Sequence, residues 1–221
     1  MTTRDRILKR LRDARKPFTE APAPPQQYLP MVPIDDTSTD ALVKRFVEAA
    51  RGLACDVHQV SSDGAAIEKL LEIIGDDTSI LAWDFEHIPL NGLEAALKES
   101  SIAIAEAGDP HVRVGVTGAE AALASTGSLV YKSGPGRHRL TSLLPPVHVG
   151  IIRHSQIMPG FEDWIADRRG KGIKEAFRDS SNIVLISGPS RTADIAMESI
   201  MGVHGPGTVH VIVVPDKQGE V

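Results

Sequence analysis

The stretch Ile183-Val-Leu-Ile-Ser-Gly-Pro-Ser-Arg-Thr-Ala-Asp194 joins an apolar run to a polar, turn-forming segment. Its first four residues are typical of a short strand that is covered on both faces. Gly188 and Pro189 end this strand, and Ser190 is a favourable N-cap, so we expect a helix to begin at Arg191. A buried strand that leads straight into a helix is typical of an α/β fold.

The same join predicts a binding site for an anion. The first backbone N–H groups of a helix have no partner within the helix, and the helix dipole adds partial positive charge there. Arg191 contributes a planar guanidinium that suits a carboxylate or a phosphate. Hydroxyl groups are added by Ser187, Ser190 and Thr192. The alternative is an ordinary capped helix in which Arg191 pairs with Asp194, since most capped helices bind nothing.

Helix-forming and strand-forming segments alternate along the rest of the chain. We expect helices at Asp40–Arg51, Gly64–Ile74, Gly92–Glu99 and within Phe161–Arg178, and strands at Asp56–Val60, Ser79–Trp83, Ser101–Glu106, Val112–Val116, Leu129–Tyr131, Val147–Arg153 and Val209–Val214. This alternation predicts a three-layer α/β/α fold with a mostly parallel central sheet. Ligands of such folds gather at the carboxyl ends of the strands, near a change in strand order.

A second join follows the strand that ends at Val116. Thr117 and Glu120 have the spacing of a capping box, which gives both residues a structural role and predicts a helix over 121–124. Gly127 is expected to end that helix in a left-handed conformation. The hydroxyl groups of Thr126 and Ser128 then either satisfy the helix end or face a ligand.

A turn-rich loop, Lys132-Ser-Gly-Pro-Gly-Arg-His-Arg139, carries several basic side chains. One interpretation is a mobile, solvated hairpin. The other is a lid that brings Arg137 and Arg139 over an anionic ligand.

Three histidines lie close to predicted strands: His148, His204 and His210. Their spacing matches no zinc pattern, so we expect no metal site and interpret each of them as a hydrogen-bonded structural residue. His204 precedes a Gly-Pro pair just before the last strand, and it is a weak candidate for an acid/base group.

The composition is that of a globular domain: 42% of the 221 residues are hydrophobic, and the net charge at pH 7 is −5. An acidic chain without an aromatic, basic strand pattern is not expected to bind nucleic acid. The single cysteine, Cys55, cannot form an internal disulfide or hold an iron–sulfur cluster alone. No apolar run approaches the length of a membrane span, so we expect a cytoplasmic protein.

The N-terminal part has a different character. Residues Thr3–Lys16 predict a basic helix with a narrow apolar face, and a proline-rich tether follows it. We therefore divide the chain into an arm, residues 1–38, and a single α/β domain, residues 39–221. The charged helix is either an ordinary solvated face or a docking arm for a partner subunit or an acidic membrane surface. We favour docking on a partner over the membrane, and the partner includes a second copy of the chain.

Five motifs occur together in this order: Gly115-Val-Thr-Gly-Ala119, Ser125-Thr-Gly-Ser128, Ser142-Leu-Leu-Pro-Pro-Val-His148, the Ser187–Asp194 segment and Gly202-Val-His-Gly-Pro206. With these motifs the chain resembles the lactate utilization protein C family from about Thr39 onward. The resemblance implies the fold of ribose-5-phosphate isomerase, glucosamine-6-phosphate deaminase and the CoA-transferases. It also implies work beside iron–sulfur subunits that oxidise L-lactate to pyruvate, with the clusters on those partners and no cofactor in this chain.

One position departs from the family. Relatives commonly carry an acidic residue before the Thr-Gly pair, where this chain has Ser125, and a serine cannot replace a carboxylate nucleophile or base. Three functions therefore stay open: a lactate-oxidising subunit with a small anionic ligand, a stand-alone enzyme on a sugar phosphate or acyl-CoA, and a non-catalytic interaction module. The predicted ligand-binding residues are Thr126, Gly127, Ser128, Arg137, Arg139, Ser187, Gly188, Pro189, Ser190, Arg191 and Thr192.

Overall fold

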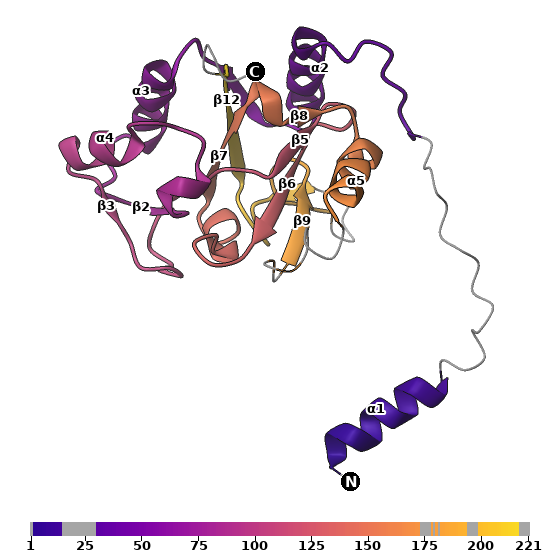
Figure 1. The fold of residues 1–221 in the computed structure, drawn as a ribbon. Helices are drawn as coiled ribbons and strands as arrows, with labels where there is room; N and C mark the ends of the chain where they lie inside the picture. Colours follow the sequence, from indigo (N-terminus) through magenta and orange to yellow (C-terminus); the bar gives the residue numbers. More distant parts are fainter. Residues whose placement is uncertain are drawn as a thin grey trace.

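The computed structural model describes residues 2–14, 30–172, 178, 180, 182–193 and 199–216. A parallel sheet forms its centre (Figure 1). It has six strands in the order β1-β12-β7-β4-β2-β3. The strands are β1 (Asp56–Gln59), β2 (Ser79–Ala82), β3 (Ala103–Ile104), β4 (Val114–Thr117), β7 (Val147–Arg153) and β12 (Thr208–Val214). The predicted α/β class and parallel central sheet are confirmed.

Helices cover one face of this sheet. Helices α3 (Asp63–Ile74) and α4 (Leu93–Glu99) lie on the same side in Figure 1. Helix α3 connects β1 to β2, and α4 connects β2 to β3, so both connections run toward the β3 edge of the sheet. Right-handed connections that run in the same direction place their helices on the same face of the sheet. Their apolar stripes are buried, as Leu70 of α3 and Leu97 of α4 illustrate.

The opposite face is covered by helix α2 and a second sheet. Helix α2 (Thr39–Gly52) buries Leu42, Val43, Phe46, Val47 and Ala50, which share one helical stripe. The second sheet has the order β8-β5-β6-β9, with strands β5 (Ala121–Leu123), β6 (Ser128–Ser133), β8 (Ile157–Met158) and β9 (Asn182–Ile186). Helix α5 (Phe161–Gly170) packs its buried Trp164 with the second sheet's other face.

The helix predicted over 121–124 is wrong, because this segment is strand β5. It pairs with β6 on one side and β8 on the other, and all of its residues are buried. Four residues are too few to stabilise a helix by themselves, so burial between two layers decides their conformation. Gly127 does take the left-handed conformation, with φ +70°, but it closes the turn between β5 and β6 instead of a helix.

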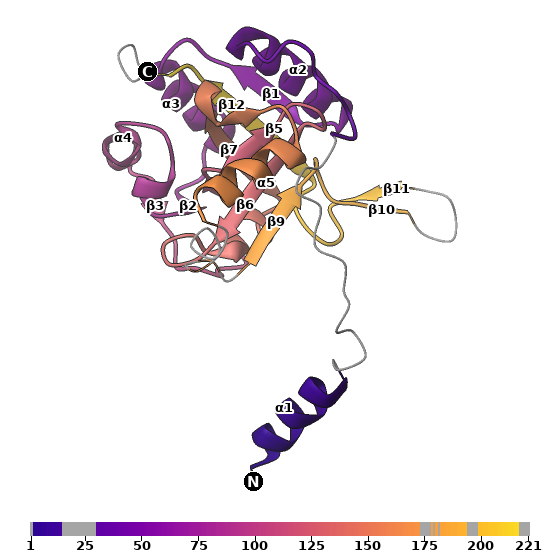
Figure 2. The same cartoon turned by 45° about the vertical axis from the view of Figure 1, so that its right-hand side comes forward.

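The helix predicted from Arg191 is also wrong. Arg191–Ala193 form strand β10, which pairs antiparallel with β11 (Ser199–Met201), and Figure 2 shows this hairpin projecting from the body of the protein. The Ser190 N–H donates to the carbonyl of Pro206 (2.8 Å), and the Ser190 carbonyl accepts from Gly202 (2.9 Å). These bonds join the two arms of the hairpin at its base, so Ser190 is not an N-cap.

The preceding strand also differs in its surroundings. The segment predicted as a strand covered on both faces forms β9. Among the described strands β9 pairs only with β6, at an edge of the second sheet, and Leu185 is 45% exposed. The join after β9 therefore does not lie at the carboxyl end of a parallel strand.

Helix α1 (Thr3–Ala14) confirms the predicted N-terminal helix over its described part, and it has no buried residue. The predicted tether falls largely on residues 15–29, which lie outside the described residues.

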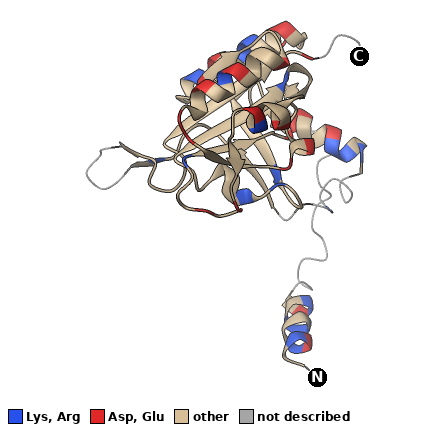
Figure 3. Ribbon diagram, turned by 90° about the vertical axis from the view of Figure 1, so that its left-hand side faces the viewer, with Lys and Arg blue, Asp and Glu red and all other residues tan. Residues whose placement is uncertain are grey.

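Figure 3 shows that charged residues gather on the helices, whereas the central strands carry few. Three short 3-10 helices complete the described elements: η2 (Phe85–His87), η3 (Arg139–Ser142) and η4 (His154–Gln156). None of the described helices has the length and apolar character needed to cross a bilayer.

Candidate functional site

A polar cavity of about 110 Å³ opens at the carboxyl ends of β2 and β4. Its lining residues are Trp83, His87, Ala119, Glu120, Lys132 and Arg137. Trp83 directly follows β2, and Ala119 and Glu120 follow β4. The segments that follow the two strands lie close together. A Cβ added at Gly118 would lie only 2.2 Å from the carbonyl oxygen of His87, so glycine is needed at this contact.

The position of this cavity follows from the strand order. After β2 the chain moves outward to β3, whereas after β4 it moves in the opposite direction to β7 and β12. The connections therefore leave β2 and β4 on opposite faces of the sheet. A crevice at such a switch point is where α/β proteins bind their ligands, so we call this cavity the switch pocket.

Buried side chains support the Trp83 wall of the switch pocket. The Trp83 ring meets the Tyr131 ring edge-on, and their centroids are 5.8 Å apart. The Tyr131 ring in turn contacts the His148 ring, with a centroid distance of 5.5 Å. Gly150 on β7 makes room for Tyr131, since a Cβ there would lie 2.7 Å from the phenol oxygen. Burial raises the pKa of Tyr131, so its hydroxyl stays neutral.

His148 is a hydrogen-bonded structural residue, as predicted. Its Nε2 lies 2.9 Å from the Thr117 hydroxyl oxygen, and the side chain has no exposed surface. Burial lowers the pKa of His148 to about 4, so the imidazole is neutral at neutral pH. Thr117 therefore bonds to a histidine and forms no capping box with Glu120.

The charged lining is mainly basic. Lys132 is the buried penultimate residue of β6, and Arg137 is half-buried. Glu120 is the acidic member of the lining, and its carboxylate pairs with Arg168 at 2.6 Å. The Nε2 atom of His87 lies 3.4 Å from the Oε1 atom of Glu86. A lysine and an arginine in the same lining suit an anionic ligand.

Hydrogen bonds attach the basic loop to the end of β2. The Trp83 Nε1–H donates to the carbonyl of His138 (3.1 Å), and the Asp84 N–H donates to the carbonyl of Gly136 (2.8 Å). Of the two loop arginines predicted to bind a ligand, Arg137 lines the switch pocket, whereas Arg139 is exposed and outside the lining. These bonds hold the loop on the body of the protein, which does not fit a mobile, solvated hairpin.

The other predicted ligand-binding residues gather at the opposite edge of the sheet. The Thr126 hydroxyl donates to the Ser128 hydroxyl (2.9 Å), and the Ser128 and Ser187 hydroxyl oxygens are 2.8 Å apart. Gly127 is pressed against the C-terminal turn of α2, where a Cβ would lie 2.4 Å from the Ala50 nitrogen. The structure brings these hydroxyl groups together, but not with Arg137.

Arg191 belongs to the same edge. Its guanidinium donates to the carbonyl oxygen of Leu53 (3.1 Å), which is the C-cap of α2, and a Cβ at Gly188 would lie 2.5 Å from that oxygen. A cation at a helix C-terminus complements the helix dipole. Without a helix at Arg191, the N–H donors on which the predicted anion site depended are absent from this position.

The remaining predicted residues lie around the hairpin. Pro189 is buried, Thr192 pairs with Ile200 of β11, and His204 is exposed with its backbone N–H bonded to the Ser190 hydroxyl (3.3 Å). The proposed pairing of Arg191 with Asp194 falls outside the described residues.

His210 is hydrogen-bonded as predicted. Its Nδ1 lies 3.1 Å from Nε2 of His58, and the two rings stack.

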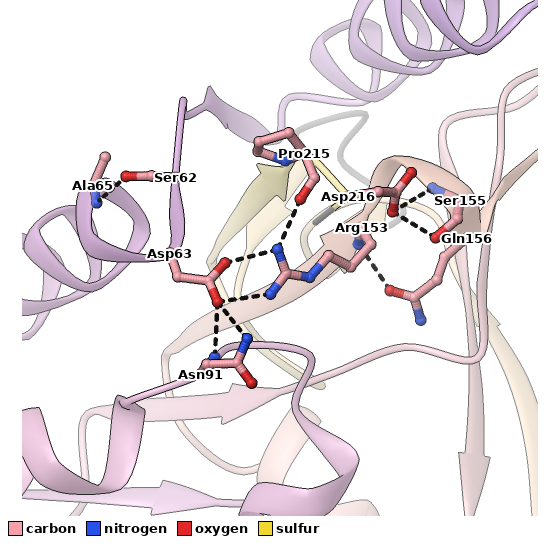
Figure 4. A network of polar contacts seen from close by, with 9 residues as sticks. All are labelled: Ser62, Asp63, Ala65, Asn91, Arg153, Ser155, Gln156, Pro215 and Asp216. Atoms are coloured by element: carbon pink, nitrogen blue, oxygen red, sulfur yellow. Dashed lines mark hydrogen bonds and ion pairs between the residues drawn. The ribbon is translucent and has the colours of Figure 1, made fainter. Parts of the chain in front are cut away.

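At the carboxyl ends of β7 and β12, a network of structural contacts lies beside helix α3 (Figure 4). Arg153, the last residue of β7, pairs with Asp63 of α3 at 2.7 Å and also donates to the Pro215 carbonyl. The Arg153 guanidinium lowers the pKa of Asp63. These bonds tie β7, β12 and α3 together at this edge.

The predicted ligand-binding set omitted Trp83, His87 and Lys132. They come from the segment after β2 and from the end of β6, far apart in the sequence. The available signal was the rule that ligands bind at carboxyl strand ends, because Trp83 follows the apolar run of β2 directly.

The fold and the site define an α/β protein with a basic pocket at the switch point of a parallel sheet. The LUD domain family model matches residues 43–214, and the chain belongs to this family. The chain is 31% identical to lactate utilization protein C of Shouchella clausii, over 83% of both chains. It is also 31% identical to lactate utilization protein C of Halalkalibacterium halodurans, over 81% of this chain and 82% of that protein.

A solved structure shares the fold. It is a DUF162 family protein from Deinococcus radiodurans, with a TM-score of 0.58 and 15% sequence identity, and the match covers 81% of this chain and 99% of that one. At this identity the likeness concerns the fold alone.

Proposed function

We propose that this chain is a subunit of an L-lactate utilization system and binds a small anionic ligand in the switch pocket. Its partners are iron–sulfur subunits that oxidise L-lactate to pyruvate. The names of its relatives support the first part of this proposal, because they are lactate utilization proteins that match most of the chain.

The observation that carries the ligand proposal is the basic lining of the switch pocket. Lys132 on β6 and Arg137 on the loop that follows β6 line the same cavity, while the carboxylate of Glu120 is paired with Arg168. Arginine offers a bidentate fork and lysine a point charge, and both suit a carboxylate or a phosphate.

The size of the pocket limits the ligand. A water molecule needs at least roughly 10–15 Å³ of such space, so a cavity of about 110 Å³ accepts several water-sized groups but not a nucleotide. L-Lactate and pyruvate are carboxylates of suitable size. A long acyl-CoA chain would have to extend outside the cavity.

The chemistry of Cys55 supports placing the clusters on partners. Iron–sulfur clusters are held by cysteine thiolates. Cys55 is the single cysteine of the chain, and burial raises its pKa to about 11, which keeps the thiol protonated. The chain's contribution to lactate oxidation would then be binding and assembly.

Substitution of Arg137 tests the ligand proposal. Arg137→Gln should weaken binding of pyruvate or L-lactate by ~1.5–3 kcal/mol, about 10- to 150-fold, because a charge-assisted hydrogen bond is lost. Isothermal titration calorimetry on the full chain measures this. Arg139→Gln is the matched control, since Arg139 lies on the same loop but outside the lining. Equal affinities in the wild type and Arg137→Gln, or no binding by either, would contradict the proposal.

A further inference from the structure

We propose that Trp83 is the positioning residue of the switch pocket: its indole N–H holds the loop of residues 134–139 and thereby fixes Arg137 toward the ligand. This inference rests on the proposed anion site and adds the element that organises it. Trp83 itself lines the cavity, so it links the cavity wall to the basic loop.

The first step is the rigidity of Trp83. Its side chain is only 4% exposed, and its ring is held edge-on against Tyr131, which rests on Gly150 and His148 of the central sheet. A buried aromatic ring with such contacts has little rotational freedom. The indole N–H therefore presents a fixed donor at the end of β2.

The second step is the shape of the loop. Gly134 and Arg137 exchange two backbone hydrogen bonds, with N···O distances of 3.0 and 3.3 Å, so residues 134–137 form a tight turn. The carbonyl of the next residue, His138, accepts the bond from Trp83 (3.1 Å). Arg137 is thus held between the turn on one side and the Trp83 anchor on the other.

Gly136 provides a second contact between the loop and the segment that follows β2. Its φ is +68°, its carbonyl accepts from the Asp84 N–H at 2.8 Å, and a Cβ would lie 2.5 Å from the Asp84 carboxylate. A side chain at residue 136 would be strained at this φ and would displace the Asp84 side chain beside the end of β2. Gly136→Ala and loss of the Trp83 N–H should therefore have the same consequence for Arg137.

A double-mutant cycle tests the proposal. Pyruvate affinity is measured by calorimetry for the wild type, Trp83→Phe, Arg137→Gln and the double variant of the full chain. Trp83→Phe keeps an aromatic ring and removes the N–H donor. We expect it to weaken binding by roughly two- to tenfold, as for loss of one net hydrogen bond, and to have no further effect when Arg137 is already replaced.

The chain supplies a matched control. Trp164→Phe changes the other tryptophan, which is buried with the second sheet, and it should leave pyruvate affinity unchanged in both backgrounds. Thermal melts identify any variant that does not fold. Gly136→Ala replaces Trp83→Phe in the cycle in that case, because it disturbs the loop without removing the ring.

The outcomes separate the two proposals. If Arg137→Gln weakens binding but Trp83→Phe has no effect, or weakens binding equally in both backgrounds, Trp83 does not position Arg137 and the pocket itself stands. If Arg137→Gln leaves the affinity of the wild type unchanged, the anion site is wrong and the role of Trp83 falls with it.

Discussion

At the scale of the residue, burial sets the chemistry beneath the switch pocket. His148 lies in the interior between the two sheets, where its ring contacts Tyr131 and its Nε2 bonds the Thr117 hydroxyl group. Burial lowers its pKa to about 4, against about 6.5 for an unfolded histidine. Between these pH values the unfolded chain binds a proton that the folded protein does not.

This difference predicts a specific loss of stability in acid. The contribution of neutral His148 is fully present above pH 6.5 and falls by up to about 1.4 kcal/mol per pH unit toward pH 4. His148→Gln keeps a polar group for Thr117 but cannot titrate, so its free energy of unfolding should depend less on pH than that of the wild type. Urea unfolding between pH 7 and 4 measures the two slopes.

An exposed histidine provides the control for this prediction. His111→Gln should show the same pH dependence as the wild type, because His111 is exposed. A slope for His148→Gln that equals the wild-type slope would show that His148 is not the titrating group.

At the scale of the element, the turn between β5 and β6 shows how packing overrides local preference. Residues 121–124 contain three alanines, which favour a helix, yet the segment is a strand because small side chains fit between two covered faces. Gly127 allows the following turn to lie directly on α2. The layer arrangement therefore depends on the absence of a side chain at this position.

Gly127→Ala should lower the free energy of unfolding by ~2–4 kcal/mol. The added Cβ would lie 2.4 Å from the Ala50 nitrogen, and alanine is strained at φ +70°. Gly170→Ala at the end of α5 meets no atom within 4 Å and should leave stability unchanged or raise it by about 0.4–1 kcal/mol. Chemical denaturation of both variants measures the effects, and equal stabilities would contradict the packing of this turn on α2.

At the scale of the whole molecule, the parallel sheet could be predicted and the site only in part. Strands such as β7 and β12 are rich in Val and Ile because both of their faces are buried, and that pattern is visible in the sequence. The hairpin at Arg191 could not be distinguished from a capped helix, because Ser190 suits both and its bonds to Pro206 and Gly202 are set by tertiary structure.

The switch pocket illustrates the same limit. Arg137 was predicted from the composition of its loop, whereas Trp83 and His87 required the strand order, which brings the end of β2 beside the end of β4. The motif residues from Ser187 to Thr192, on which the resemblance to the family was based, lie by the C-terminus of α2, at the other edge of the sheet. The residues that suggested the family are therefore not the residues that line the switch pocket.

The most direct test of the central claim is a crystal structure of the full chain grown with pyruvate. We expect electron density for a carboxylate in the switch pocket, within hydrogen-bonding distance of Lys132 and Arg137, and no density at the Arg191 hairpin. Pyruvate bound instead at Ser187–Thr192, or a switch pocket that holds only water at a saturating pyruvate concentration, would contradict the account.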